Sequence, residues 1–253
     1  MVDIRSSPSK IIDYLTCPRM FYFRYCTTMG KGNRTSSPQL ERGSILHEIY
    51  EAYNTNPDKF EQYVSFIEES SDHEEYEKNL YGFFWLLEKY GLDRADYSEL
   101  EIMDEGLNLK GIIDAIYVKK MEGECSQAEF VLIDYKTGKF NKTNKKNYMI
   151  QLYIYEHIAN NWFRQRNGNA NGNYIDRIGL FFTAFPEESF IVEVNDKKRE
   201  RYMGYAYEVM DKIKNDDFTG VGKLCKWCQF ATQCDDYSDE IITQTNDHVL
   251  MVV

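Results

Sequence analysis

Residues 131–139 have the sequence VLIDYKTGK, an apolar run that carries an aspartate and a lysine two positions apart and then turns at a glycine. Side chains alternate across a β-strand, so we expect Asp134 and Lys136 on one face and Tyr135 on the other. Two charges on one face of an apolar strand do not fit an ordinary core. This strand is therefore the first candidate for a functional site.

A matching apolar segment, GIIDAIYV at residues 111–118, carries one acid, Asp114. The polar residues 121–129, which include Gly123, predict a turn, so the two segments are expected to pair as an antiparallel hairpin. Asp114, Asp134 and Lys136 would then meet in one small space. Two carboxylates that close repel each other unless a cation lies between them, and divalent metals take oxygen ligands of this kind. The hairpin thus predicts a metal-dependent site.

Composition limits the class of protein. A chain of 253 residues with 43% hydrophobic and 15% aromatic residues is long enough for one sizeable domain, or at most two small ones. The net charge of −11 lacks the basic footprint usual for nucleic-acid partners. Much of the surplus acid lies in residues 54–97, where we expect a helical insertion with a solvated acidic face. The net charge of the whole chain therefore says little about the charge around the candidate site of Asp114, Asp134 and Lys136.

Neither a membrane span nor a signal peptide is expected, because the apolar segments are short and the first ten residues are polar. A cytoplasmic, reducing compartment is the default expectation. Six cysteines in such a compartment favour metal ligands or free thiols over a disulfide framework.

Apolar periodicity and turn residues predict the remaining elements. Helices are expected over residues 7–25, from Arg42 onward, over 147–166 and over 196–211, and a second strand pair over 178–185 and 190–194. His47 lies near the apolar side of the second helix, where a lone histidine is more often a core residue than a ligand. Gln151 and Tyr155 lie one turn apart on the third helix and share a face, which by itself usually means packing.

Four lysines follow the central strand in a loop rich in Asn and Thr: Lys139, Lys142, Lys145 and Lys146. Solvated surface charge and contacts to DNA phosphates explain them about equally well.

Three cysteines near the C-terminal end have the spacing of metal ligands. Cys225 and Cys228 are separated by two residues, so both sulfurs can reach one metal across a turn, and Cys234 follows at short range. Three ligands leave a four-coordinate site open, and Cys17, set before a proline, is the best-placed fourth. Spacing alone allows either zinc or an iron–sulfur cluster. Cys26 and Cys125 lack comparable surroundings and are expected to be structural.

Taken in order along the chain, these segments resemble the RecB-like branch of the PD-(D/E)XK nuclease superfamily, in the subgroup with a four-cysteine iron–sulfur cluster. CRISPR-associated four-cysteine exonucleases and the AddB nuclease domain are similar. The resemblance rests on residues 14–22 around Cys17, on Arg42 and Gly43 leading to His47, on residues 111–114 and 134–138, on Gln151 with Tyr155, and on the terminal cysteines. Residues 54–100 match nothing specific in that family.

The resemblance implies one nuclease domain over residues 1–253, of α/β class. It would have a restriction-endonuclease-like core with a central mixed β-sheet flanked by helices, a helical insertion at about 54–97 and a cysteine segment at 221–237. It also implies that His47, Asp114, Asp134 and the main-chain carbonyl of Tyr135 hold Mg2+ or Mn2+. The remaining implied roles are catalysis or substrate contact by Lys136, Gln151 and Tyr155, DNA contact by the four lysines, and a 4Fe-4S cluster on Cys17, Cys225, Cys228 and Cys234 that joins the two ends of the chain.

The implied activity is hydrolysis of DNA phosphodiester bonds from strand ends or on single strands. Repair, recombination, viral DNA processing and CRISPR adaptation are the settings in which such an exonuclease acts, in the cytoplasm of a cell or of a viral host. A phosphate-binding loop ending in Lys-Ser or Lys-Thr is absent from the sequence, so unwinding would need a separate helicase partner. Two alternatives remain: a catalytically inactive nuclease fold that binds DNA or recruits partners, and a zinc-stabilised structural protein.

Overall fold

The computed structural model describes residues 5–32, 37–120, 128–168, 172–220, 222 and 225–235. The chain forms two compact units, one made of residues up to 35 together with those from 203 onward, and the other of residues 36–202. Three sequence expectations fall wholly or partly outside the described residues: the turn at 121–129, Cys125, and part of the cysteine segment 221–237.

The unit formed by residues 36–202 is built on a five-stranded mixed sheet in the order β1-β2-β3-β4-β5. Its strands are β1 (Tyr97–Asp104), β2 (Leu109–Lys120), β3 (Ala128–Lys136), β4 (Ile175–Phe182) and β5 (Phe190–Glu193). Strands β2 and β3 pair antiparallel, with Ala115 opposite Ile133, as the hairpin prediction required. Only β3 and β4 are parallel, because the long helix α7 (Lys145–Asn167) connects them.

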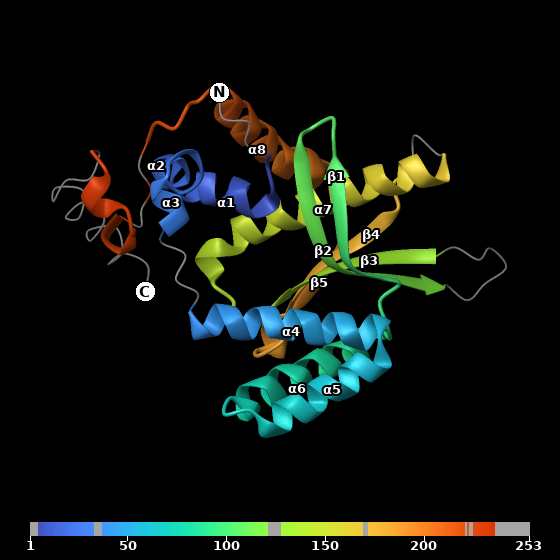
Figure 1. Ribbon diagram of the computed structural model, residues 1–253. Helices are drawn as coiled ribbons and strands as arrows, with labels where there is room; N and C mark the ends of the chain where they lie inside the picture. The colour runs from blue at the N-terminus through green and yellow to red at the C-terminus, as the bar shows by residue number, and fades with distance from the viewer. Residues whose placement is uncertain are drawn as a thin grey trace. The chain divides into compact units, whose positions relative to one another are not determined.

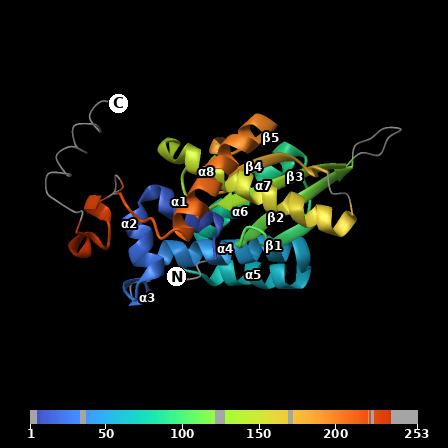
Figure 2. The same ribbon diagram turned by 90° about the horizontal axis from the view of Figure 1, so that it is seen from above.

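Helices cover the sheet on both sides. The helices α4 (Pro38–Thr55), α5 (Pro57–Glu69) and α6 (His73–Tyr90) stack together, and α7 lies across the strands (Figures 1 and 2). Tyr50 and Phe83 of α4 and α6 stack on each other and pack with Tyr135 of β3 in one buried cluster. This α/β architecture is the restriction-endonuclease-like class that the sequence predicted.

Several element boundaries differ from the sequence expectations by a few residues, as for β4, which spans Ile175–Phe182 instead of 178–185. Helix α4 begins at Pro38 rather than Arg42, because the Ser37 side chain caps it by accepting from the Leu40 amide. Strand β1 starts at Tyr97, so the last residue of the range 54–97 belongs to the sheet and not to the helices. Within that range α5 and α6 are helical as expected.

The other unit contains α1 (Pro8–Thr16), α2 (Pro18–Phe21) and the short α3 (Met29–Gly32); α8 (Asp196–Lys214) leads into its C-terminal part. The single helix expected over residues 7–25 is broken at Cys17, which adopts an extended conformation before Pro18. Phe21 stacks on Phe218, and the Tyr14 hydroxyl donates to the Asp217 carbonyl. The N-terminal helices and the chain after α8 therefore share one core. None of the helices in the described ranges is long and apolar enough to cross a bilayer.

Candidate active site

The aspartate and lysine of β3 form an ion pair. Lys136 Nζ lies 2.7 Å from Asp134 Oδ2, and the side chain of Tyr135 packs away from them against Tyr50 and Phe83. The alternation predicted for this strand is confirmed. Asp134 is only 2% exposed, and its Oδ2 has the lysine as an ionic neighbour but makes no well-directed hydrogen bond with the described residues.

Asp114 of β2 lies beside this pair. Its Oδ2 accepts a 2.7 Å hydrogen bond from the Tyr135 amide of the neighbouring strand. Burial raises the pKa of Asp114 to about 7, the charge of Asp134 adds to the rise, and His47 and Lys136 oppose it. The carboxylates of Asp114 and Asp134 therefore repel each other in a buried site, and a bound cation would offset this repulsion.

Burial lowers the pKa of Lys136, but the charges of Asp134 and Asp114 outweigh burial and leave that pKa above its ordinary value. The lysine is therefore a cation at neutral pH.

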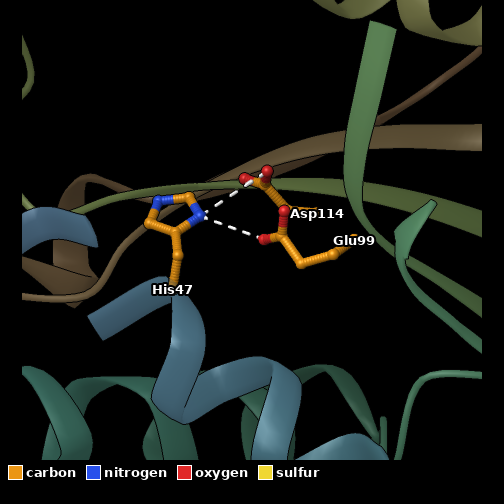
Figure 3. A group of neighbouring side chains, drawn as sticks. All are labelled: His47, Glu99 and Asp114. Carbon is orange, nitrogen blue, oxygen red and sulfur yellow. Dashed lines mark hydrogen bonds and ion pairs between the residues drawn. The ribbon is translucent and has the colours of Figure 1, made fainter. Parts of the chain in front are cut away.

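His47, on α4, points at the acids of the sheet (Figure 3). Its Nδ1 lies 3.4 Å from Glu99 Oε1 and 3.6 Å from Asp114 Oδ1. Burial lowers the pKa of His47, while the hydrogen bond to Glu99 and the charge of Asp114 raise it more, so the net direction is upward. A lone histidine on a helix is usually a packing residue. Here the two acids Glu99 and Asp114 lie next to the ring, so His47 is a candidate metal ligand.

Glu99 completes a group that the sequence analysis missed. Within the described ranges, His47, Glu99 and Asp114 form the one set of three His, Cys or acidic ligand atoms that lie within 4.8 Å of one another. Glu99 lies in β1 between the cross-strand pairs Ser98–Ala115 and Leu100–Ile113, at the level of Asp114. Its sequence signal was the alternation of polar and apolar residues in YSELEI, which predicts a strand.

Glu99 also has an unusual backbone. Its φ is +46°, in the left-handed region that a residue with a side chain rarely occupies inside a strand. Such strain persists only where the surrounding structure enforces it, and it is commonest at functional sites. The strain marks this position of β1 as special.

Gln151 and Tyr155 of α7 reach the same place. Gln151 Nε2 lies 3.3 Å from Asp134 Oδ1 and 3.3 Å from the Tyr155 hydroxyl. The amide therefore links the tyrosine to the buried carboxylate, so the shared face of these two residues is aimed at the site rather than only at the core.

The four lysines of the 139–146 segment lie elsewhere. Lys142 and Lys145 are exposed at the start of α7, and Lys139 packs over the Phe185 ring at 5.8 Å. Among the described residues, none of the four lines the cleft beside His47. Their contact with DNA stays a prediction.

The four predicted cluster cysteines all lie in the unit that contains both chain ends, as partly exposed free thiols. Cys17 caps α2 by accepting from the Met20 amide, and Cys225 and Cys228 flank one helical turn. In the described part of the chain no three cysteine sulfurs lie within 4.8 Å of one another. The described residues therefore do not support the four-cysteine site that the resemblance implies.

A comparison with models of protein families identifies the superfamily. The family model of the PD-(D/E)XK nuclease superfamily matches residues 5–235, so the chain belongs to that superfamily. A crystal structure of a "Putative exonuclease" from Eubacterium rectale is similar, with a TM-score of 0.54 at 14% identity over 92% of this chain and 89% of that chain. A crystal structure of the protein SSO0001 matches less well, with a TM-score of 0.46 at 14% identity over 94% and 89% of the two chains. No curated protein sequence matches.

Membership of a nuclease superfamily makes nucleic acid the expected class of partner and a divalent metal the expected cofactor. The donor set fits such an ion, because carboxylate oxygens are ligands of divalent metals, and the imidazole nitrogen suits an ion softer than Mg2+.

Proposed function

We propose that the protein is a divalent-metal-dependent deoxyribonuclease that acts as an exonuclease on single strands or strand ends. The observation that carries the proposal is the approach of His47, Glu99 and Asp114 to within 4.8 Å, next to the Asp134–Lys136 ion pair. A site that gathers three acids, an imidazole and an amine in a nuclease fold suits phosphodiester hydrolysis better than DNA binding alone.

The side chains divide into ligands and supporting groups. His47, Asp114 and Glu99 would hold the ion, together with Asp134 and the Tyr135 carbonyl, and the imidazole favours Mn2+ over Mg2+. Once bound, the ion supplies Lewis acidity to the phosphoryl group and lowers the pKa of a water molecule. Because burial raises the pKa of Asp114 to about 7, binding of the ion and ionisation of this acid would be coupled.

Lys136 acts on the phosphate. It is a cation at neutral pH, so its ammonium balances the negative charge that develops on the phosphate oxygens as the attacking water adds. Gln151 fixes one oxygen of Asp134 and thereby leaves the other directed at Lys136. Tyr155 holds the Gln151 amide in that position.

A 4Fe-4S cluster on Cys17, Cys225, Cys228 and Cys234 is a second part of the proposal. The support for it is the spacing of the cysteines in the sequence and the place of all four in one compact unit of the chain. Each thiolate of a four-iron cluster binds its own iron, which spaces the sulfurs more widely than a single ion does. The cluster would join the two ends of a single nuclease domain, which acts in the cytoplasm with a separate helicase.

The test is digestion of end-labelled DNA by anaerobically purified protein with Mn2+ or Mg2+, on single-stranded and duplex substrates. Asp134→Ala and Lys136→Ala run beside the wild type, and their folding is checked by thermal unfolding. The proposal predicts shortening from the ends by the wild type and inert variants, and the label position gives polarity. A folded wild type that cuts neither substrate with either metal refutes the proposal and favours the inactive DNA-binding alternative.

A further inference from the structure

A cleft of about 590 Å3 opens beside the candidate metal ligands. One wall is the face of α4 that carries Leu40, Ser44 and His47, and the other is the β1–β2 pair with Glu99 and Ile112. His47 and Glu99 belong both to this cleft and to the ligand group, so whatever occupies the cleft lies next to the reacting centre.

Two aliphatic side chains line the cleft and are open to solvent. Leu40 is 66% exposed and Ile112 is 43% exposed. Leu40 precedes His47 by seven residues and so lies on the same side of α4, while Ile112 precedes Asp114 by two residues in β2. Single exposed leucines are common, but two that line one cleft beside a reactive centre form an apolar contact surface.

The charged groups of the cleft are acidic. Glu48, Glu51, Glu99 and Glu101 line it, and no lysine or arginine does so among the described residues, although Lys110 pairs with Glu101 at 2.7 Å from outside the lining. The charges of Glu48, Glu51 and Glu99 remain. A phosphate group is repelled by such a lining wherever no metal ion screens it. An uncharged ring that carries N–H donors suits both the carboxylates and the aliphatic pair.

We propose that this cleft binds one unpaired nucleobase, the one adjacent to the phosphate undergoing hydrolysis, with Leu40 and Ile112 in contact with its faces. The inference rests on the proposed nuclease function and names the substrate class of the same site. A base can enter only when it is unpaired, so single strands and frayed ends are preferred to closed duplex. The glutamates favour bases with an exocyclic amino donor, which cytosine has and thymine lacks.

The experiment removes one base at a time. A single strand is prepared in versions that carry an abasic residue at successive positions, and Mn2+-dependent cleavage at each phosphate is measured for the wild type, Leu40→Ala, Leu40→Ala/Ile112→Ala and Val64→Ala. Val64 is an exposed aliphatic residue of α5 outside the cleft and serves as the matched control. Leu40 and Ile112 are both exposed, so the variants are expected to fold. If the double variant does not fold, Leu40→Ala alone tests the base site.

Loss of the base next to the cut phosphate is expected to slow cleavage there by about 5- to 100-fold in the wild type and Val64→Ala, from the usual strength of base contacts. In the double variant the intact and abasic strands are expected to differ by less than twofold. An oligomer of deoxycytidine is expected to be cut faster than one of thymidine by the wild type.

The outcomes separate this inference from the nuclease proposal. Wild-type cleavage that ignores base removal, or a base effect that survives in the double variant, overturns the base site and leaves the nuclease intact. When the wild type cuts nothing, the nuclease proposal fails, and binding of the same strands in Mn2+ by the wild type and by Leu40→Ala/Ile112→Ala decides the base site alone. Equal binding of intact and abasic strands then overturns it.

Discussion

Replacing Lys136 by methionine is expected to destabilise the metal-free protein strongly, because Asp134 would stay buried without its counter-charge. At the observed separation of 2.7 Å, Coulomb attraction reaches about 6 kcal/mol for an effective dielectric constant of 20. Breaking a buried pair by removing one partner typically costs about 3–5 kcal/mol. Asp134 is 2% exposed and has Asp114 nearby, so we expect a loss of about 3 kcal/mol or more.

The double variant Asp134→Asn/Lys136→Met tests the cause of that loss. With both charges gone, no buried Asp134 charge is left without its partner, so stability is expected to recover most of the way, with a coupling energy of about 2 kcal/mol or more. Urea unfolding at pH 7.5 in EDTA measures all four proteins of the cycle. Added Mn2+ is expected to stabilise Lys136→Met more than the wild type, because the ion replaces the missing positive charge.

The reasoning is refuted by either of two results. One is a Lys136→Met protein within 1 kcal/mol of the wild type in EDTA. The other is a double variant whose loss equals the sum of the two single losses, since additive effects mean that the two side chains do not interact.

Three further predictions concern Glu99, Glu156 and the cysteines. Glu99→Gly is expected to leave the stability of the metal-free protein unchanged or to raise it by up to about 1 kcal/mol, since glycine adopts a φ of +46° without strain. The same variant is expected to bind Mn2+ at least tenfold more weakly in calorimetry. Unchanged affinity would remove Glu99 from the ligand set. Burial raises the pKa of fully buried Glu156 to about 7 from 4.5 although Arg199 opposes it, so the folded protein loses stability as pH rises through this window. Glu156→Gln should therefore gain about 3 kcal/mol relative to the wild type between pH 4.5 and 8, and a pH-independent difference in urea unfolding contradicts this. Serine in place of Cys17, Cys225, Cys228 or Cys234 is expected to abolish a brown iron–sulfur absorbance together with soluble protein, and a stable colourless variant argues against the cluster.

The central hairpin could be predicted from the sequence because its signals are local. Asp134 and Lys136 interrupt an apolar run with period two, and β3 has the alternation and the antiparallel partner that this pattern indicates. The helices α7 and α8 likewise follow from apolar periodicity. Polar caps and prolines shifted boundaries by a few residues, as at Pro38 and at Cys17 before Pro18.

Glu99 could not be identified from the sequence because its role depends on long-range pairing. Its carboxylate reaches the site only since β1 pairs with β2 and the backbone at Glu99 adopts a positive φ. The residues around Glu99 in the sequence predict neither the strand pairing nor the positive φ. The same holds for His47. Its helical pattern alone predicts a packing residue, and it is a candidate ligand only because Glu99 and Asp114 of the neighbouring strands lie beside it.

The most direct test of the central claim is Mn2+-dependent release of nucleotides from single-stranded DNA by the wild type, measured in EDTA, after Mn2+ is restored, and beside Asp134→Asn. Asparagine keeps the size of the side chain and removes its charge, and thermal unfolding in Mn2+ checks that the variant is folded. The account predicts no release in EDTA, release once Mn2+ is restored, and a loss of at least a hundredfold in Asp134→Asn. Release that continues in EDTA, or an Asp134→Asn protein as active as the wild type, would contradict it.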